Sequence, residues 1–224
     1  MGKQVKGLLI HNFYLNKKML LVYVVVVVLI SKYLIRDYIE NGTKELILAS
    51  NIYGFTMAYL LGLFAVKLYD AKKDQKWSWF LSTINQGRRA AIQAKFITDA
   101  IFILIDFLLM GFIITGVLLK FNIKPSLLCY IGLMMAIFVV LITSSIDNLV
   151  YFLDYTQTKK VLIYIIVTLF IFLYAYLIMG GKIGSIKIKS AIIRENVAII
   201  SVFVGVIVNL VTKNVIITRM KLDE

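Results

Sequence analysis

The stretch FITDAIFILIDFLLMGFIITGVLL, from Phe96 to Leu119, decides the fold class of this chain. A helix needs about 20 mainly apolar residues to cross the hydrocarbon core of a bilayer, and this stretch is longer than that. Its only ionisable side chains are those of Asp99 and Asp106. Because a lone strand in lipid would leave its backbone polar groups without hydrogen bonds, the stretch is predicted to be a membrane-spanning helix.

The rest of the chain has the same character. It is 61% hydrophobic with a mean hydropathy of +0.88, whereas soluble domains are about 45–50% apolar. Five further stretches have the length or the apolarity of a span. With the first, the predicted spans are Met19–Ile35, Leu46–Val66, Phe96–Leu119, Leu127–Leu149, Val161–Met179 and Val197–Val211. The sequence therefore predicts an all-α integral membrane protein with six transmembrane helices in one domain, residues 1–224.

The distribution of basic residues predicts the orientation of the spans. If both termini are cytoplasmic, 16 of the 25 Lys and Arg residues lie on the cytoplasmic side and nine on the other. Cytoplasmic loops carry the excess of positive charge, so the N-in, C-in topology is favoured. Before the first span, Val5, Leu8, Leu9 and Phe13 fall near helical spacing, which predicts a short amphipathic helix in the cytoplasmic interface.

The formal net charge of +13 has a simple explanation in a membrane protein, since basic loops contact anionic lipid. No nucleic-acid partner is expected. Catalytic and metal-binding patterns are missing: His11 is the sole histidine and Cys129 the sole cysteine. The G-x-x-x-x-G-K-[ST] phosphate-binding loop does not occur either. We expect no enzymatic activity, no metal and no cofactor in this chain.

The segment between the second and third spans, Lys67–Lys95, holds seven basic residues and both tryptophans. Trp77, Phe80, Leu81 and Ile84 are spaced i, i+3, i+4, i+7, which gives a helix of about three turns one apolar face. Gly87 interrupts this pattern, and a second helical run starts at Arg88-Arg89. The segment is predicted to be a cytoplasmic helical hairpin, which either anchors in the lipid headgroups or docks a soluble partner.

The same segment resembles a loop of the type-2 ATP-binding-cassette exporter permeases. The resemblance rests on Tyr69-Asp70-Ala71-Lys72, Lys76-Trp77, Leu81-Ser82-Thr83-Ile84-Asn85, Arg88-Arg89 and Lys95-Phe96. The N-terminal GLLIHNFYLNKKMLLVYVVV is also similar to the interface helix and first span of that family. Ala71 stands where the family has Glu, and Ile84-Asn85 replaces Leu-Pro. Among these permeases, the compact chain looks most like Gram-positive peptide exporters and bacteriocin-resistance permeases.

The resemblance implies a function. The hairpin would be the coupling helix that docks on a separate cytoplasmic ATPase, which would bind the ATP and Mg. A second copy of the chain or a related permease would complete a path for a peptide across the bacterial cell membrane. The residues implied in coupling are Asp70, Lys72, Trp77, Phe80, Leu81, Ile84, Arg88, Arg89 and Lys95.

Polar residues inside the spans are the remaining candidates. Asp99 and Asp106 are seven residues apart, hence on one helix face, and charged groups in lipid are costly. They, together with Asn51, either bond to another span or line a translocation path. Two other functions stay open on the sequence alone. One is a non-transporting immunity or scaffold protein that binds a toxin or partner in the bilayer, and the other is a proton-coupled carrier.

Overall fold

The computed structural model describes residues 6–7, 9–10, 22, 25, 28–29, 32–33, 35–36, 43–70, 87–152, 157–179, 188 and 190–222. Most of the predicted interface helix and first span therefore lies outside the described residues. The same holds for the hairpin residues Lys72, Trp77, Phe80, Leu81 and Ile84. Asp70, Arg88 and Arg89 belong to described helices, but only their backbone is described.

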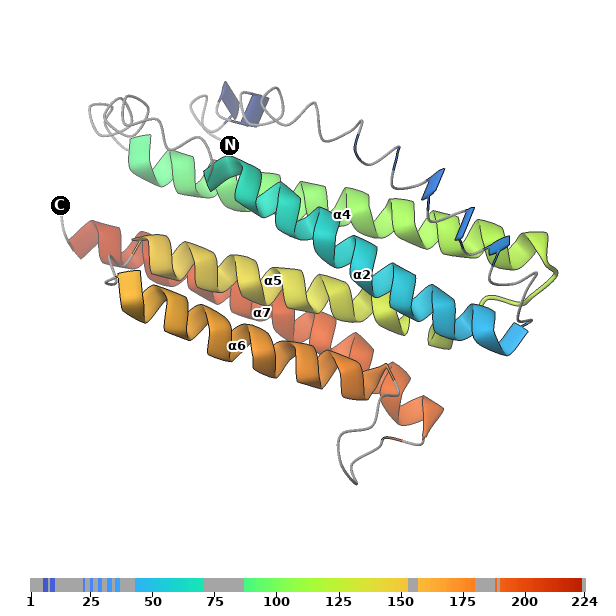
Figure 1. Cartoon of the computed structure of the whole chain (residues 1–224). Helices are drawn as coiled ribbons and strands as arrows, with labels where there is room; N and C mark the ends of the chain where they lie inside the picture. The colour runs from blue at the N-terminus through green and yellow to red at the C-terminus, as the bar shows by residue number, and fades with distance from the viewer. Residues whose placement is uncertain are drawn as a thin grey trace.

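The described part of the chain is helical and has no strand (Figure 1). Its elements are α2 (Thr43–Asp70), α4 (Gly87–Lys120), the 3-10 helix η1 (Leu127–Tyr130), α5 (Ile131–Phe152), α6 (Gln157–Ile178) and α7 (Ala191–Leu222). The α-helices lie side by side and alternate in direction. We call one end of this bundle the Gly87 end, where α4 and α6 begin and α2, α5 and α7 finish. The opposite end is the Lys120 end.

Three of the described helical stretches are long and apolar enough to cross a membrane: Ile92–Lys120, Leu127–Ile146 and Ala191–Arg219. Two shorter apolar stretches, Ile47–Leu60 and Ile165–Ile178, belong to α2 and α6. The helical, membrane-spanning character predicted from the sequence is confirmed for these three stretches. The boundaries differ from the predicted ones at two places. α7 begins at Ala191, six residues before the predicted sixth span, and the predicted fourth span opens with η1 before α5 starts.

The turn after α4 has a local cause. The N–H of Ile123 donates to the carbonyl of Leu118 at 2.9 Å, which closes the last turn of the helix. Asn122 has a φ of 56°, in the left-handed region that Asn tolerates better than most residues. Pro125 follows in the connection to η1, where it cannot continue a helix. These residues turn the chain back so that α5 runs antiparallel to α4.

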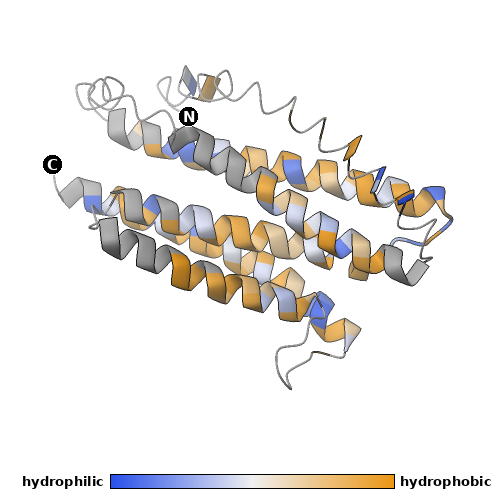
Figure 2. Cartoon of the chain, viewed as in Figure 1, coloured by the Kyte–Doolittle hydropathy of each residue, from blue (hydrophilic) through white to orange (hydrophobic). Residues whose placement is uncertain are grey.

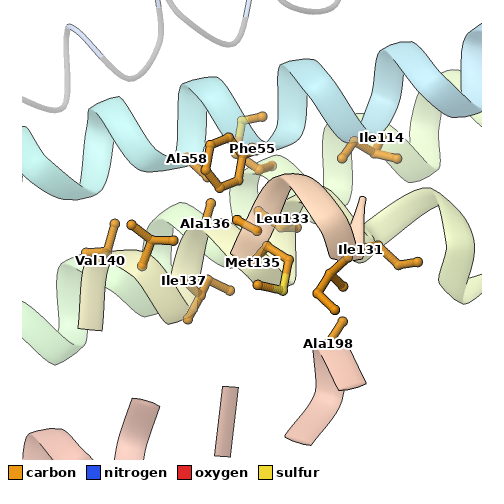
Figure 3. Close-up of a cluster of buried hydrophobic side chains, with 14 of the residues drawn as sticks. Phe55, Ala58, Ile114, Ile131, Leu133, Met135, Ala136, Ile137, Val140 and Ala198 are labelled. Carbon is orange, nitrogen blue, oxygen red and sulfur yellow. The ribbon is translucent and has the colours of Figure 1, made fainter. Parts of the chain in front are cut away.

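α5 lies at the centre of the bundle and contacts α2, α4, α6 and α7. Figure 3 shows part of the core around it, where Phe55 and Ala58 of α2 meet Leu133, Ala136 and neighbouring side chains. Small residues allow the closest approaches. The Gly132 N–H donates to Asn51 Oδ1 across the α2–α5 contact, and a methyl group at Gly132 would overlap the Asn51 backbone. Small residues at helix contacts are typical of membrane proteins.

The outer surface of the described helices is apolar. Phe112 of α4 is 83% exposed, and Phe170, Ile192 and Phe203 are also exposed. Figure 2 shows hydrophobic residues along most of the described helix length. Exposed apolar area of this extent would not be stable in water, and it fits a bundle whose solvent is lipid.

Many hydroxyl groups inside the bundle bond to their own helix. The side chains of Thr56, Thr98, Thr115, Thr143, Ser145, Ser201 and Thr218 each donate to the carbonyl four residues earlier, at 2.7–2.9 Å. Such bonds satisfy a polar group without a partner from another helix.

Candidate functional site

A group of buried polar side chains joins α4, α5 and α7 nearer the Gly87 end of the bundle. We call it the polar layer. Its members are Lys95 and Asp99 of α4, Ser144, Ser145 and Asn148 of α5, and Asn209 of α7. All but Asn209 are almost fully buried.

The centre of the polar layer is Asp99. Its Oδ2 lies 3.5 Å from Lys95 Nζ, one helical turn earlier, in a buried ion pair. The Ser144 hydroxyl donates to the same Oδ2 at 3.3 Å and so links α5 to α4. The sequence predicted Arg88, Arg89 or Lys95 as partners of Asp99, and the structure shows the pairing with Lys95. A buried ion pair that also receives a hydrogen bond is the arrangement in which a charge is tolerated in an apolar interior.

The polar layer continues from Ser144 and Ser145 in two directions. Asn148 Nδ2 donates to Ser144 Oγ at 3.4 Å, one turn along α5 toward the Gly87 end. Asn209 Nδ2 of α7 donates to Ser145 Oγ at 3.1 Å. The Oδ1 of Asn148 is buried and has no hydrogen-bond partner among the described residues. The layer therefore ties three helices together and keeps an unused acceptor.

Asp106 lies apart from the polar layer, farther from the Gly87 end on the same face of α4. It is 3% exposed, and no described residue forms a hydrogen bond with its Oδ1. Phe102 and Met110, four residues before and after it, are buried apolar side chains. The structure thus gives the two aspartates different surroundings, which their shared spacing did not reveal.

Asn51 occupies a third position, at the contact of α2 with η1 and α5. Its Nδ2 donates to the Leu128 carbonyl at 2.7 Å and to the Ile47 carbonyl of its own helix at 3.0 Å. Its Oδ1 accepts from the Gly132 N–H at 2.7 Å. That N–H belongs to the first turn of α5, where backbone donors have no partner within the helix. Asn51 therefore acts as an interhelix bridge in this arrangement.

The predicted coupling segment is represented by the helices that flank it. α2 finishes and α4 begins at the Gly87 end, so the residues between them leave and re-enter the bundle at that end (Figure 1). The first turn of α4 carries Arg88 and Arg89 and no acidic residue. Positive charge at a helix N-terminus opposes the helix dipole by about 0.3–1 kcal/mol, which a nearby anionic group would offset.

Two parts of the site were not found by sequence reasoning. Ser144, Ser145 and Asn148 were seen only as polar points within a span, and Asn209 was not singled out. Asn209 is the one polar side chain between Ser201 and Thr212, and this isolation is a signal that could have identified it. No group of three His, Cys, Asp or Glu side chains that could hold a metal ion occurs within the described residues.

Comparison of the chain with protein-family models, with curated proteins and with solved structures finds no match. The similarity to exporter permeases therefore rests on the residues quoted above and stays a prediction.

Proposed function

We propose that this chain is the membrane-spanning permease subunit of an ATP-driven exporter of amphipathic peptides. In this proposal it has six spans with both termini in the cytoplasm of a bacterial cell. It pairs with a second copy or a related permease, and a separate ATPase binds the Lys67–Lys95 segment. The ATP and Mg belong to that ATPase, and this chain supplies no catalytic residue.

One observation carries the proposal. α4 is a single helix from Gly87 to Lys120, so the residues next to the coupling segment are rigidly connected to the polar layer and to Asp106. At about 1.5 Å per residue it is roughly 50 Å long. α4 also contacts α2, α5 and α7. A force applied at Arg88 and Arg89 would move a helix that touches most of the described bundle, as switching between inward-open and outward-open states requires.

The charge at the Gly87 end supports a docking role as well. The basic first turn of α4 lacks an acidic residue of its own. An acidic groove on a soluble partner, or lipid phosphate, would provide the missing negative charge. The two can be distinguished by experiment, because a protein partner is captured by cross-linking and a lipid is not.

The test is co-purification from native membranes. The chain carries a C-terminal tag, the membranes are cross-linked, and the captured proteins are identified by mass spectrometry. We expect a stoichiometric ATPase with a phosphate-binding loop, cross-linked through residues 67–95. A double charge reversal, Arg88→Glu with Arg89→Glu, should abolish this capture without lowering the amount of chain in the membrane.

The matched control reverses two charges at the other end of the bundle, Lys120→Glu with Lys124→Glu, and should leave the capture intact. Equal ATPase recovery with both double variants would contradict the docking role. A preparation free of ATPase, from cells that express one, would contradict the exporter proposal and favour the immunity or scaffold function.

A further inference from the structure

Asp106 has no role in the proposed ATPase docking, yet its position is unusual. It lies halfway along the membrane-spanning stretch Ile92–Lys120 of α4. It is almost fully buried, and its Oδ1 has no hydrogen-bond partner among the described residues. A buried polar atom without a partner is rare in folded proteins, and each one calls for an explanation.

Asp99, on the same face of the same helix, provides the comparison. Lys95 and Ser144 both contact its Oδ2, so a negative charge there has a positive charge and a hydroxyl donor beside it. Asp106 is seven residues further on, a rise of about 10 Å along the axis. The buried side chains of Phe102 and Ile103 lie between the two positions on α4.

The helices packed against α4 bring no charge to Asp106. Between Leu46 and Val66 the only ionisable residues of α2 are Tyr53 and Tyr59, and Tyr59 stacks edge-on with Phe172 of α6. α5 has none between Ile131 and Ile146, and α7 has none between Val197 and Thr212. In η1, Cys129 is buried and the Tyr130 hydroxyl is 2.6 Å from Thr115 Oγ1.

An ionised carboxylate at this position would therefore lack both water and a counter-ion from these elements. The neutral acid avoids that cost, because a single bound proton removes the charge. We propose that Asp106 is a proton-binding site in the membrane interior, occupied by a proton while the helices are packed as they are here.

The proposal has a consequence for the working protein. If α4 separates from α2 and α5, water reaches Asp106 and the carboxyl can release its proton. Opening of the bundle would then be linked to proton release, and alkaline pH would favour the open arrangement. This inference does not rest on the ATPase, because it follows from the surroundings of one side chain.

Dicyclohexylcarbodiimide, an apolar reagent for protonated carboxyl groups, tests the proposal. The carboxyl proton moves to a carbodiimide nitrogen while the carboxylate oxygen bonds to the central carbon. The O-acylisourea then rearranges to an N-acylurea, so nothing leaves and the residue gains the mass of the whole reagent. The full chain is labelled in lipid vesicles and the modified residue is located by mass spectrometry.

We expect the adduct on Asp106 and not on Asp99, with slower labelling as the pH is raised. Asp106→Asn should fold and lose the adduct, and Asp99→Asn should retain it. Infrared spectroscopy provides a measurement that needs no reagent access: a protonated-acid carbonyl band should be present in the parent chain and absent from Asp106→Asn. Absence of that band from the parent chain, or labelling of Asp99 in preference to Asp106, would overturn the proposal.

Discussion

A methyl group added at Gly132 tests whether α2 and α5 pack as described. The new carbon in Gly132→Ala would overlap the carbonyl oxygen of Asn51 and would lie only 2.6 Å from its carbonyl carbon and 2.7 Å from its Cα. Ordinary contacts of a Cβ begin at 3.4 Å. The obstacle is backbone, which cannot rotate away as a side chain can, so the two helices must move apart.

The cost can be worked from these contacts. Overpacking costs about 1–3 kcal/mol. Separation of the helices also breaks two hydrogen bonds of 2.7 Å, from Gly132 N–H to Asn51 Oδ1 and from Asn51 Nδ2 to the Leu128 carbonyl. Interhelix hydrogen bonds in membranes are worth about 0.6 kcal/mol each and up to about 1.7. We expect a loss of about 3 kcal/mol in the free energy of unfolding, which lowers the melting midpoint by roughly 6–12 °C in a chain of this size.

Thermal unfolding of the purified chain in detergent measures this shift. Gly116→Ala is the matched control, because a Cβ at Gly116 of α4 would meet nothing within 4 Å, and we expect a change within about 0.5 kcal/mol. Adding Asn51→Ala to Gly132→Ala should not restore stability, since the overlap is with the Asn51 backbone. A Gly132→Ala midpoint equal to that of Gly116→Ala would refute the close approach of the two helices.

Three further predictions concern other contacts. Lys95→Met or Asp99→Asn alone should destabilise the bundle by about 3–5 kcal/mol, since each removes one charge of a buried ion pair, whereas the double variant should recover part of the melting midpoint. Ser145→Ala and Asn209→Leu should each cost about 1 kcal/mol, and a double-mutant cycle in detergent should show that the two losses are not additive, because both remove the same bond. Phe112→Lys should cost about 2 kcal/mol or more and lower the amount of chain that resists alkaline extraction from membranes, whereas Phe112→Leu should not; equal amounts would show that this surface does not face lipid.

The sequence predicted the features that depend on one helix at a time. The apolar stretch from Phe96 to Leu119 was recognised as a span because length and composition are properties of the stretch itself. The spacing of Asp99 and Asp106 put both on one face of α4 for the same reason, and both are buried. Local spacing also suggested Lys95 among the partners of Asp99, since residues four apart on a helix are neighbours.

Features that depend on two helices were beyond this reasoning. Asn51 and Gly132 are 81 residues apart, and nothing in either segment specifies the register at which α2 meets α5. Ser144 reaches Asp99 across 45 residues and Asn209 reaches Ser145 across 64, for which the packing must be known. The different surroundings of the two aspartates had the same origin. Periodicity identifies the face of a helix, and only the fold identifies what lies against it.

The bonds of hydroxyl groups to their own helices bear on the order in which the protein is made. A side chain such as Thr98 or Thr143 has its acceptor four residues earlier, so it is satisfied as soon as its helix forms. Such a helix can enter the bilayer from the translocation machinery alone. Asn51 differs, because its amide can donate to Ile47 at once, but its oxygen must wait until Gly132 has been synthesised. The union of α2 with α5 is then a late event in biogenesis, and a chain cut off before residue 132 would present an unsatisfied amide oxygen to lipid.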